Sequence, residues 1–331
     1  MTTVSTFLDK EVIVQAPRVT DRERTMDPVI TVDHLQKRYG AHQAVSDVTL
    51  QVYAGEIFGI AGPNGAGKTT TVECMQGLRQ HDGGDIRVLG LNPATDGPKL
   101  RRRIGSQLQQ SALPDRIRVW EALDLFATFV PGESNWEHLI DQWGLSGKEK
   151  TAFADLSGGQ QQRLFIALSL INNPEVVFLD ELTQGLDPAA RRMTWDLIRA
   201  ARDQGKTIIL VTHFMDEAEA LCDRLAIIDH GRVIDMDTPQ ALISRHGGPQ
   251  TVTFTSGERD FSWLSGLDVV DSVRRTGSLT SVSGIGPVVP LVSAALVERG
   301  FVPDDLRVHQ QSLEETFLRL TGRDSMNGMT E

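Results

Sequence analysis

Apolar and polar positions divide the middle of the chain into short apolar runs separated by amphipathic segments. The apolar runs have the length of buried strands and lie at residues 56–61, 176–179, 207–211 and 225–229. Segments with apolar residues at helical spacing lie at residues 69–78, 160–172, 189–203 and 215–222. Continuous apolar strands that alternate with helices are typical of a parallel sheet covered on both faces.

Two neighbouring regions follow other patterns. Residues 29–32 and 48–52 are strand-like, and the second segment alternates apolar with polar side chains, which predicts a half-exposed antiparallel layer. Between residues 119 and 143 apolar side chains recur at helical spacing, as Trp120, Leu123, Leu125, Phe126 and Phe129. We therefore expect a helical subdomain over about residues 100–165, inside a domain that spans residues 29–240.

The two ends of the chain differ from this centre. Residues 1–28 combine many charged side chains with few large apolar ones and lack the apolar core of a signal peptide, so we expect a mobile extension. Residues 241–331 mix short strands with helical stretches at 290–299 and 313–320. This pattern predicts a separate accessory domain at the C-terminal end.

Charge and cysteine content argue against several classes of protein. The net charge of −11 and the pI of about 5.2 argue against a uniformly basic nucleic-acid surface. Cys74 and Cys222 are the only cysteines, which gives neither a disulfide scaffold nor a zinc-binding pair and favours a reduced, cytoplasmic compartment. No run reaches the roughly 18 apolar residues that a membrane helix needs.

A phosphate-binding loop follows the first of the buried strands. It fits the pattern GxxxxGK[ST] and comprises Gly62, Pro63, Asn64, Gly65, Ala66, Gly67, Lys68, Thr69 and Thr70. Glycines allow backbone N–H groups to point at phosphates, and the helix that follows adds partial positive charge. Lys68 can reach the β- and γ-phosphates of a nucleotide, and the Thr69 hydroxyl can bind Mg²⁺.

Acidic residues end the second buried strand. Asp180 stands where phosphate-loop enzymes hold Mg²⁺, and Glu181 would point to the opposite side, toward a water that attacks the γ-phosphate. His213 follows the neighbouring strand, which would place it beside Glu181 and near the γ-phosphate. Taken alone, the acid pair could equally cap a turn, and the histidine could be structural.

The sequence Leu-Ser-Gly-Gly-Gln at residues 156–160 makes the class more specific. It resembles the signature of ABC ATPases, in which Ser157, Gly158, Gly159 and Gln160 open a helix that binds phosphate. Since the chain already has one phosphate loop, a second anion site implies a second molecule. The resemblance implies a head-to-tail pair, with each signature closing over the ATP of the other copy.

Other family positions are filled in the same order over residues 29–240. Tyr39 is similar to the aromatic residue that stacks on adenine, and Asp187 to the residue that contacts the opposite subunit. The resemblance makes Gln109 the glutamine that senses the γ-phosphate and binds the metal, although Gln107 and Gln110 remain open. Leu182 replaces the proline usual after the acidic pair, and we expect altered stiffness of that turn with retained chemistry.

The C-terminal residues 311–323 resemble the ends of ATPase subunits from ABC-2 exporters of drugs and antibiotics. The same segment could also be an amphipathic closing helix, because Leu313, Phe317 and Leu320 have core spacing. An importer subunit, or a soluble ABC ATPase that acts on ribosomes, DNA or iron–sulfur assembly, is the alternative. One cassette per chain and the lack of a long coiled-coil insertion favour transport.

The resemblance thus implies an α/β fold: a RecA-like phosphate-loop NTPase core with an antiparallel β subdomain, a helical ABC subdomain and a small α+β C-terminal domain. It implies an ATPase that converts ATP and water to ADP and phosphate with Mg²⁺. Its partners would be a second copy of itself and a separate polytopic transmembrane permease, and we expect no nucleic acid. The protein would lie on the cytoplasmic face of the membrane, with residues 109–120 transmitting closure to the permease.

Overall fold

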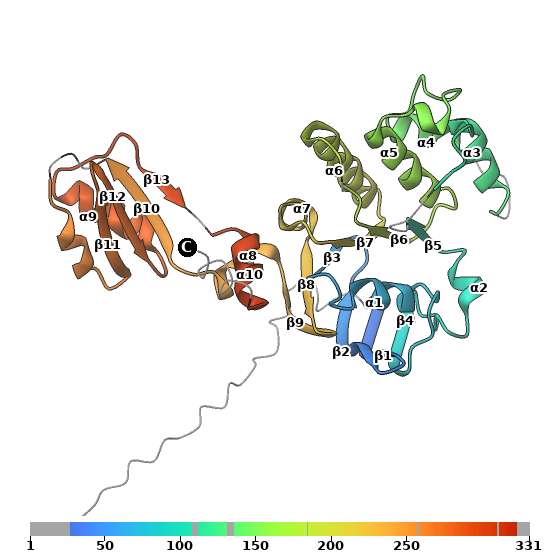
Figure 1. The fold of residues 1–331 in the computed structure, drawn as a ribbon, viewed down its shortest axis with the longest axis horizontal. Coiled ribbons are helices and arrows are strands. Elements are labelled where there is room, and N and C mark those ends of the chain that lie inside the picture. Colours follow the sequence, from blue (N-terminus) through green and yellow to red (C-terminus); the bar gives the residue numbers. More distant parts are fainter. Residues whose placement is uncertain are drawn as a thin grey trace, which may run out of the picture.

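The computed structural model describes residues 27–107, 112–130, 136–183, 185–255, 257, 259–309 and 311–322. The expected N-terminal extension falls almost wholly outside this set, and so do Gln109 and Gln110. Figure 1 shows a large sheet with helices on both faces, and a smaller sheet at the opposite end of the molecule from β4 and α2.

The large sheet has nine strands in the order β4-β1-β2-β9-β8-β3-β7-β6-β5. Their bounds are β1 Ile30–Tyr39, β2 His42–Val52, β3 Ile57–Ala61, β4 Gly83–Val88, β5 Ile104–Gln107, β6 Val176–Asp180, β7 Thr207–Thr212, β8 Arg224–Asp229 and β9 Arg232–Asp237. Strands β8, β3, β7, β6 and β5 run parallel to one another, and β8 pairs antiparallel with β9 on its other side. Every residue of β3, β6 and β7 is buried, which confirms the predicted parallel sheet.

Strands β1, β2 and β4 form the antiparallel layer, because β1 pairs antiparallel with both β2 and β4. Helix α1, Lys68–Met75, packs under this layer through Val72 and Met75, in one core with Phe58 and Phe178. The sheet's other face carries α6, Pro188–Asp203, and α7, Met215–Leu221. Neighbouring residues of a strand point to opposite faces, so the sheet separates two hydrophobic cores.

A helical region covers the second core beyond β5 and comprises α3 Val119–Ala127, α4 Glu137–Gln142 and α5 Gly158–Ser169. Trp143 and Leu164 bury this region against the sheet. The expected start at about residue 100 lies too early. Residues 97–100 form the short helix α2, Gly97–Leu100, and residues 104–107 form β5, because this strand pairs with β6 along its length.

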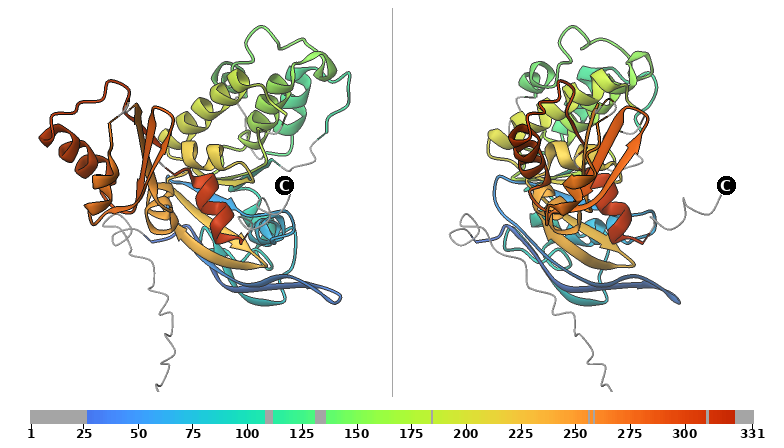
Figure 2. Two further views of the ribbon diagram at one scale, coloured as in Figure 1. Left: turned by 60° about the vertical axis from the view of Figure 1, so that its left-hand side comes forward. Right: turned by 90° about the vertical axis from the view of Figure 1, so that its left-hand side faces the viewer.

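The C-terminal part of the chain divides between two cores. Helices α8, Pro239–His246, and α10, Leu313–Leu320, pack against each other and against α7, with Leu242, Leu313 and Phe317 in the core of the large domain. Figure 2 shows α10 against the body of the molecule from two further sides. The expected boundary between residues 240 and 241 therefore falls inside α8.

The segment between these two helices forms its own small fold. Its elements are β10 Gln250–Thr255, the 3₁₀ turn η2 Ser262–Gly266, β11 Val270–Thr276, β12 Leu279–Gly284, α9 Val288–Glu298 and β13 Arg307–His309. The strands pair antiparallel in the order β11-β12-β10-β13 around a separate core that contains Val252, Phe254 and Leu296. Within the described ranges, each helix is too short or too polar to span a bilayer.

Candidate nucleotide-binding site

The phosphate loop connects β3 to α1, as its sequence pattern predicts. Gly65 and Gly67 have φ angles of 82° and 100°, a region that residues with a side chain rarely adopt. A Cβ atom at Gly67 would also lie 2.4 Å from the carbonyl oxygen of Ala44, and one at Gly62 would lie 2.1 Å from that of Ile228. The glycines thus allow the loop to lie directly against β2 and β8.

Lys68, the first residue of α1, is buried within this loop. Its Nζ atom donates hydrogen bonds to the carbonyl oxygens of Gly62 and Pro63, at 2.8 and 3.0 Å. The helix N-terminus adds partial positive charge at the same place. The loop therefore concentrates positive potential where a phosphate group would bind.

Asp180 ends β6 close to this positive charge. Burial, and then the charge of Glu181, raise the pKa of the Asp180 carboxyl to about 6, while Lys68 lowers it. Asp180 is 7% exposed, so its ionised form is poorly hydrated. A carboxylate in such a position is stabilised by a bound cation.

Glu181 begins the turn after β6 with a φ of +50°, in the left-handed region. Its backbone N–H donates to the carbonyl oxygen of Val211 at 2.9 Å, which ties the turn to β7. Its Oε1 atom lies 3.1 Å from His213 Nδ1. The structure thus brings Glu181 and His213 together, as the adjacency of β6 and β7 requires.

Leu182 and Thr183 complete this turn and are fully buried. Leu182 packs into the same core as Leu179 and Leu210, so an apolar side chain anchors the turn where the family usually has proline. Thr183 donates from Oγ1 to Glu217 Oε1 at 2.9 Å, and the Trp195 indole donates to the same oxygen at 3.2 Å. Sequence reasoning missed this contact.

The signature residues open α5 as predicted. Ser157 caps the helix: its Oγ accepts from the Gln160 N–H at 3.4 Å, and the Gln160 side chain accepts from the Ser157 N–H at 3.0 Å. Ser157 and Gly158 are exposed. Helix α5 packs on the face of the sheet opposite to α1, so the signature and phosphate loop of one chain lie on different faces (Figure 1).

Two further predicted residues lie on the surface. Tyr39 ends β1, is 39% exposed, and has the Lys37 and Arg79 cations 5.5 and 5.6 Å from its ring centroid. Asp187 caps α6 by accepting from the N–H groups of Ala189 and Ala190, and the hydrogen bonds of these amides lower the pKa of its carboxyl. Both side chains are accessible to a ligand or a second molecule.

Gln107 is buried at the end of β5, opposite Leu179 of β6. Gln109, the residue expected to sense the γ-phosphate and bind the metal, lies outside the described residues. The site as described therefore comprises the phosphate loop, Asp180, Glu181 and His213.

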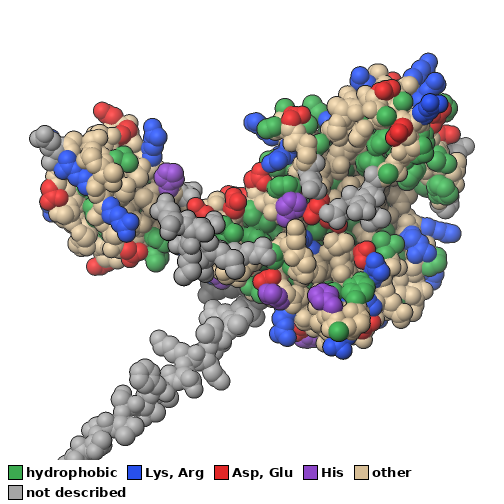
Figure 3. Space-filling view, viewed as in Figure 1, with side chains coloured by type: hydrophobic (Ala, Val, Ile, Leu, Met, Phe, Trp, Pro, Cys, Tyr) green, Lys and Arg blue, Asp and Glu red, His purple; other side chains and the backbone are tan. Residues whose placement is uncertain are grey.

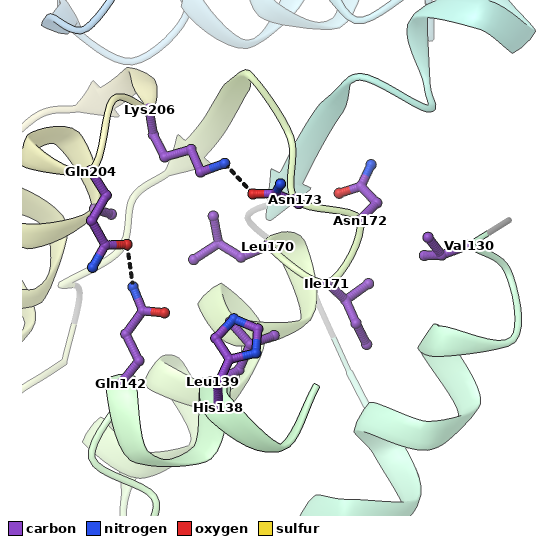
Figure 4. A pocket seen from close by; sticks show the side chains of 11 residues that line it. Val130, His138, Leu139, Gln142, Leu170, Ile171, Asn172, Asn173, Gln204 and Lys206 are labelled. Carbon is purple, nitrogen blue, oxygen red and sulfur yellow. Dashed lines mark hydrogen bonds between the residues drawn. The ribbon is translucent and has the colours of Figure 1, made fainter. Parts of the chain in front are cut away.

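A cavity of about 420 Å³ lies away from this site, between the helical region and the segments that lead into β6 and β7 (Figure 4). It is lined by Val130, His138, Leu139, Gln142, Leu170, Ile171, Asn172, Asn173, Ala201, Gln204 and Lys206. Gln142 donates to Gln204 at 3.0 Å across the cavity, and Lys206 bonds to Asn173. Apolar and polar side chains both line the cavity.

The helical region next to the cavity exposes apolar side chains. Leu125 and Phe129, four residues apart, are 46% and 77% exposed. Figure 3 shows hydrophobic side chains on this region, among interspersed basic and acidic ones. Leu125 lies on α3 and Phe129 in the turn that follows it, so both exposed apolar side chains lie at the end of this helix.

Solved structures with this fold are nucleotide-binding subunits. The structure of an ATP-binding subunit of an ABC transporter is 29% identical with a TM-score of 0.60, and the match covers 66% of this chain and 93% of that one. The structure of cbiO1 from Clostridium perfringens, part of the ABC transporter complex cbiONQ, is 26% identical with a TM-score of 0.61 and coverages of 66% and 91%. Fold and site together define a phosphate-loop ATPase.

Sequence comparison specifies the family. The sequence pattern described as ABC transporter matches residues 45–184. The Nod factor export ATP-binding protein I of Ralstonia nicotianae is 35% identical over 90% of this chain and 95% of its own length. The daunorubicin resistance ATP-binding protein DrrA3 of Streptomyces coeruleorubidus is 35% identical over 90% and 97%. The chain belongs to the ABC transporter family, as an ATP-binding subunit that hydrolyses ATP.

Proposed function

We propose that this chain is the ATPase subunit of an exporter for a drug, antibiotic or lipid-like cargo. The observation that carries export is the extent of similarity to relatives named for export and resistance. The matches cover 90% of the chain, so they extend beyond the phosphate-loop domain into the C-terminal part. We further infer that two copies work head to tail with a separate permease, at the inner face of the membrane.

In the proposed mechanism, Lys68 and the loop amides bind the β- and γ-phosphates, and Tyr39 stacks on the adenine. Glu181 orients the attacking water and accepts its proton. A carboxylate can only accept, so in the contact at 3.1 Å the His213 Nδ1 atom carries the proton. His213 thereby orients Glu181, and its Nε2 atom donates to the γ-phosphate when the ring carries both protons.

The residues at the end of β6 fit Mg²⁺. No cluster of three or more potential metal-binding side chains occurs among the described residues, and Mg²⁺ usually binds one or two protein oxygens plus phosphates and waters. Asp180, the Thr69 hydroxyl and Gln109 would supply the protein ligands. When bound, Mg²⁺ neutralises negative charge on the phosphates.

The head-to-tail pair is supported by the positions of the two phosphate-binding elements. Ser157 and Gly158 are exposed on the face of the sheet opposite to α1, so a second copy can supply its signature to the phosphate loop. Asp187 is exposed at the start of α6, where it can contact that copy. In the proposed cycle the two copies close when ATP binds, and this closure drives the permease.

The cavity and the exposed pair Leu125 and Phe129 are the proposed docking surface for the permease. They lie in or beside the helical region, whose first helix, α3, begins within the segment 109–120 that is expected to transmit closure. A cavity lined by both apolar and polar side chains, beside exposed apolar residues, suits one short amphipathic helix of a cytoplasmic loop.

Transport by inside-out membrane vesicles tests export. Vesicles that contain the full chain and its permease should accumulate the cargo when ATP is added, with daunorubicin as the first probe because of the relatives' names. Glu181→Gln should bind ATP but hydrolyse and transport about 100-fold or more slowly, the scale of a lost general base. ATP-driven depletion of a cargo loaded inside the vesicles would indicate import, and normal hydrolysis by Glu181→Gln would disprove its assignment.

A further inference from the structure

Glu217 is a carboxylate with no exposure at all, on the inner side of α7. Its Oε1 atom accepts one hydrogen bond from Thr183 Oγ1, at 2.9 Å, and one from Trp195 Nε1, at 3.2 Å. Its Oε2 atom is buried without a hydrogen-bond partner among the described residues, so the two bonds to Oε1 are what stabilise the buried carboxylate.

Glu217 and its two partners belong to three segments that reach the nucleotide site. Thr183 lies in the turn that begins with Glu181. Trp195 lies on α6, the helix that Asp187 caps. Glu217 itself follows His213 by four residues, in the first turns of α7. One buried oxygen therefore joins the segments that carry the proposed catalytic pair and the residue proposed to contact the second copy.

Further contacts bind α6 and α7 along their length. Arg191 pairs with Asp216 at 2.8 Å, and its guanidinium lies 5.4 Å from the Phe214 ring centroid. Arg199 donates to the carbonyl oxygen of Ala220 at 3.0 Å. Residues 191, 195 and 199 are spaced by four and so share one side of α6. The Arg191 and Arg199 contacts lie near the surface, where such pairs stabilise little, whereas Glu217 is buried.

We propose that Glu217 is a positioning residue that makes the Glu181 turn, the start of α7 and α6 move as one body. Closure of the second copy onto Asp187 then sets the distance between Glu181, His213 and the attacking water. This inference rests on the roles proposed above for Glu181 and His213. Burial raises the pKa of the Glu217 carboxyl, against the hydrogen bonds from Thr183 and Trp195 that lower it, so a neutral side chain with an acceptor oxygen can replace the carboxylate.

Steady-state kinetics of full-length variants test the role of the acceptor. Glu217→Gln keeps an oxygen that can accept from Thr183 and Trp195, and should retain most of kcat. Glu217→Leu keeps the size and removes the acceptor, and should lower kcat about tenfold or more with unchanged KM and ATP affinity. A purely structural role predicts lower thermal stability with parental kcat, and that result would overturn the proposal.

A second variant keeps the test decisive if Glu217→Leu does not fold. Thr183→Val removes only the hydroxyl that donates to Glu217, and should lower kcat with unchanged ATP affinity. Its matched control is Thr194→Val, since Thr194 is equally buried on α6 and, among the described residues, its hydroxyl bonds to Ala190 of its own helix alone, at 2.9 Å. Equal kcat values for the two variants would overturn the proposal.

Glu181→Gln separates this inference from the function on which it rests. If that variant hydrolyses ATP normally, the assigned roles themselves fail. If it is inactive while Thr183→Val matches Thr194→Val, those roles stand and only the positioning role of Glu217 is overturned.

Discussion

At the scale of single residues, ionised Asp180 lowers the stability of the protein when no nucleotide or metal is bound. Asp180 is ionised at neutral pH although it is buried beside Glu181, and its pKa lies at about 6 instead of 3.8. The folded protein therefore binds this proton more tightly than the unfolded chain does. The stability of the empty protein falls as the pH rises from about 4 to about 6, and then levels off.

Asp180→Asn should remove this destabilisation. The neutral amide should raise the free energy of unfolding of the metal-free, nucleotide-free protein at pH 7, by at most about 3 kcal/mol. Since the effect needs the ionised parent, it should shrink to about half near pH 5. Urea unfolding of both proteins at the two pH values measures it, and an equal gain at both would show that ionisation of Asp180 is not the cause.

At the scale of elements, α5 and α3 face different partners in the proposed assembly. Ser157→Arg places a long cation at the exposed start of α5. We expect ATP to bind the phosphate loop of the same chain normally, while ATP-dependent pairing of two copies is lost. Light scattering with ATP measures the pairing, and Ser146→Arg, another exposed serine of the helical region, is the control. Pairing by the Ser157 variant would contradict the composite site.

Phe129→Asp tests the surface proposed to dock the permease. A charge on this 77% exposed side chain should reduce retention of the ATPase on permease-containing membranes and uncouple transport, while ATPase activity of the free subunit stays unchanged. Ile234→Asp, on β9, is a matched substitution at another exposed apolar residue and should leave retention intact. Equal loss in both variants would point to general surface effects.

The sequence predicted helices and strands correctly where the spacing and the length of the apolar positions distinguished one from the other. Strands β3, β6 and β7 are continuous apolar runs, and the helix expected at residues 313–320 is α10, Leu313–Leu320. Glu217 escaped prediction because an acidic residue in a short amphipathic helix looks like a solvent-facing one. The pairing of α8 with α10 escaped because the helices are far apart in sequence, and local periodicity carries no information on such contacts.

At the scale of the whole molecule, the small sheet is held between two helices of the larger domain. Gln311 connects the crossing segments at its base, accepting from the Gly248 N–H and donating to the Pro249 carbonyl oxygen. The hydrophobic core of the small sheet shares no residue with the core of the larger domain that contains Leu242 and Phe317. The small sheet can therefore be removed without opening the larger domain.

We expect deletion of residues 250–309, with a short glycine linker, to leave thermal stability and nucleotide binding nearly unchanged. Truncation after Thr238 should instead lower stability strongly, because it removes Leu242, Leu313 and Phe317 from the larger core. Thermal unfolding of both variants with ADP distinguishes them. Equal stability would mean that α8 and α10 contribute little to the core.

The closing position of α10 also has a consequence for synthesis on the ribosome. Leu313 and Phe317, close to the end of the described chain, are buried beside residues from α7 and α8. The ATPase core is therefore complete only after α10 has been translated, although the catalytic motifs emerge much earlier. A chain that stops prematurely exposes this apolar surface and becomes a substrate for proteolysis. Only chains that include α10 then survive to work with a transmembrane subunit.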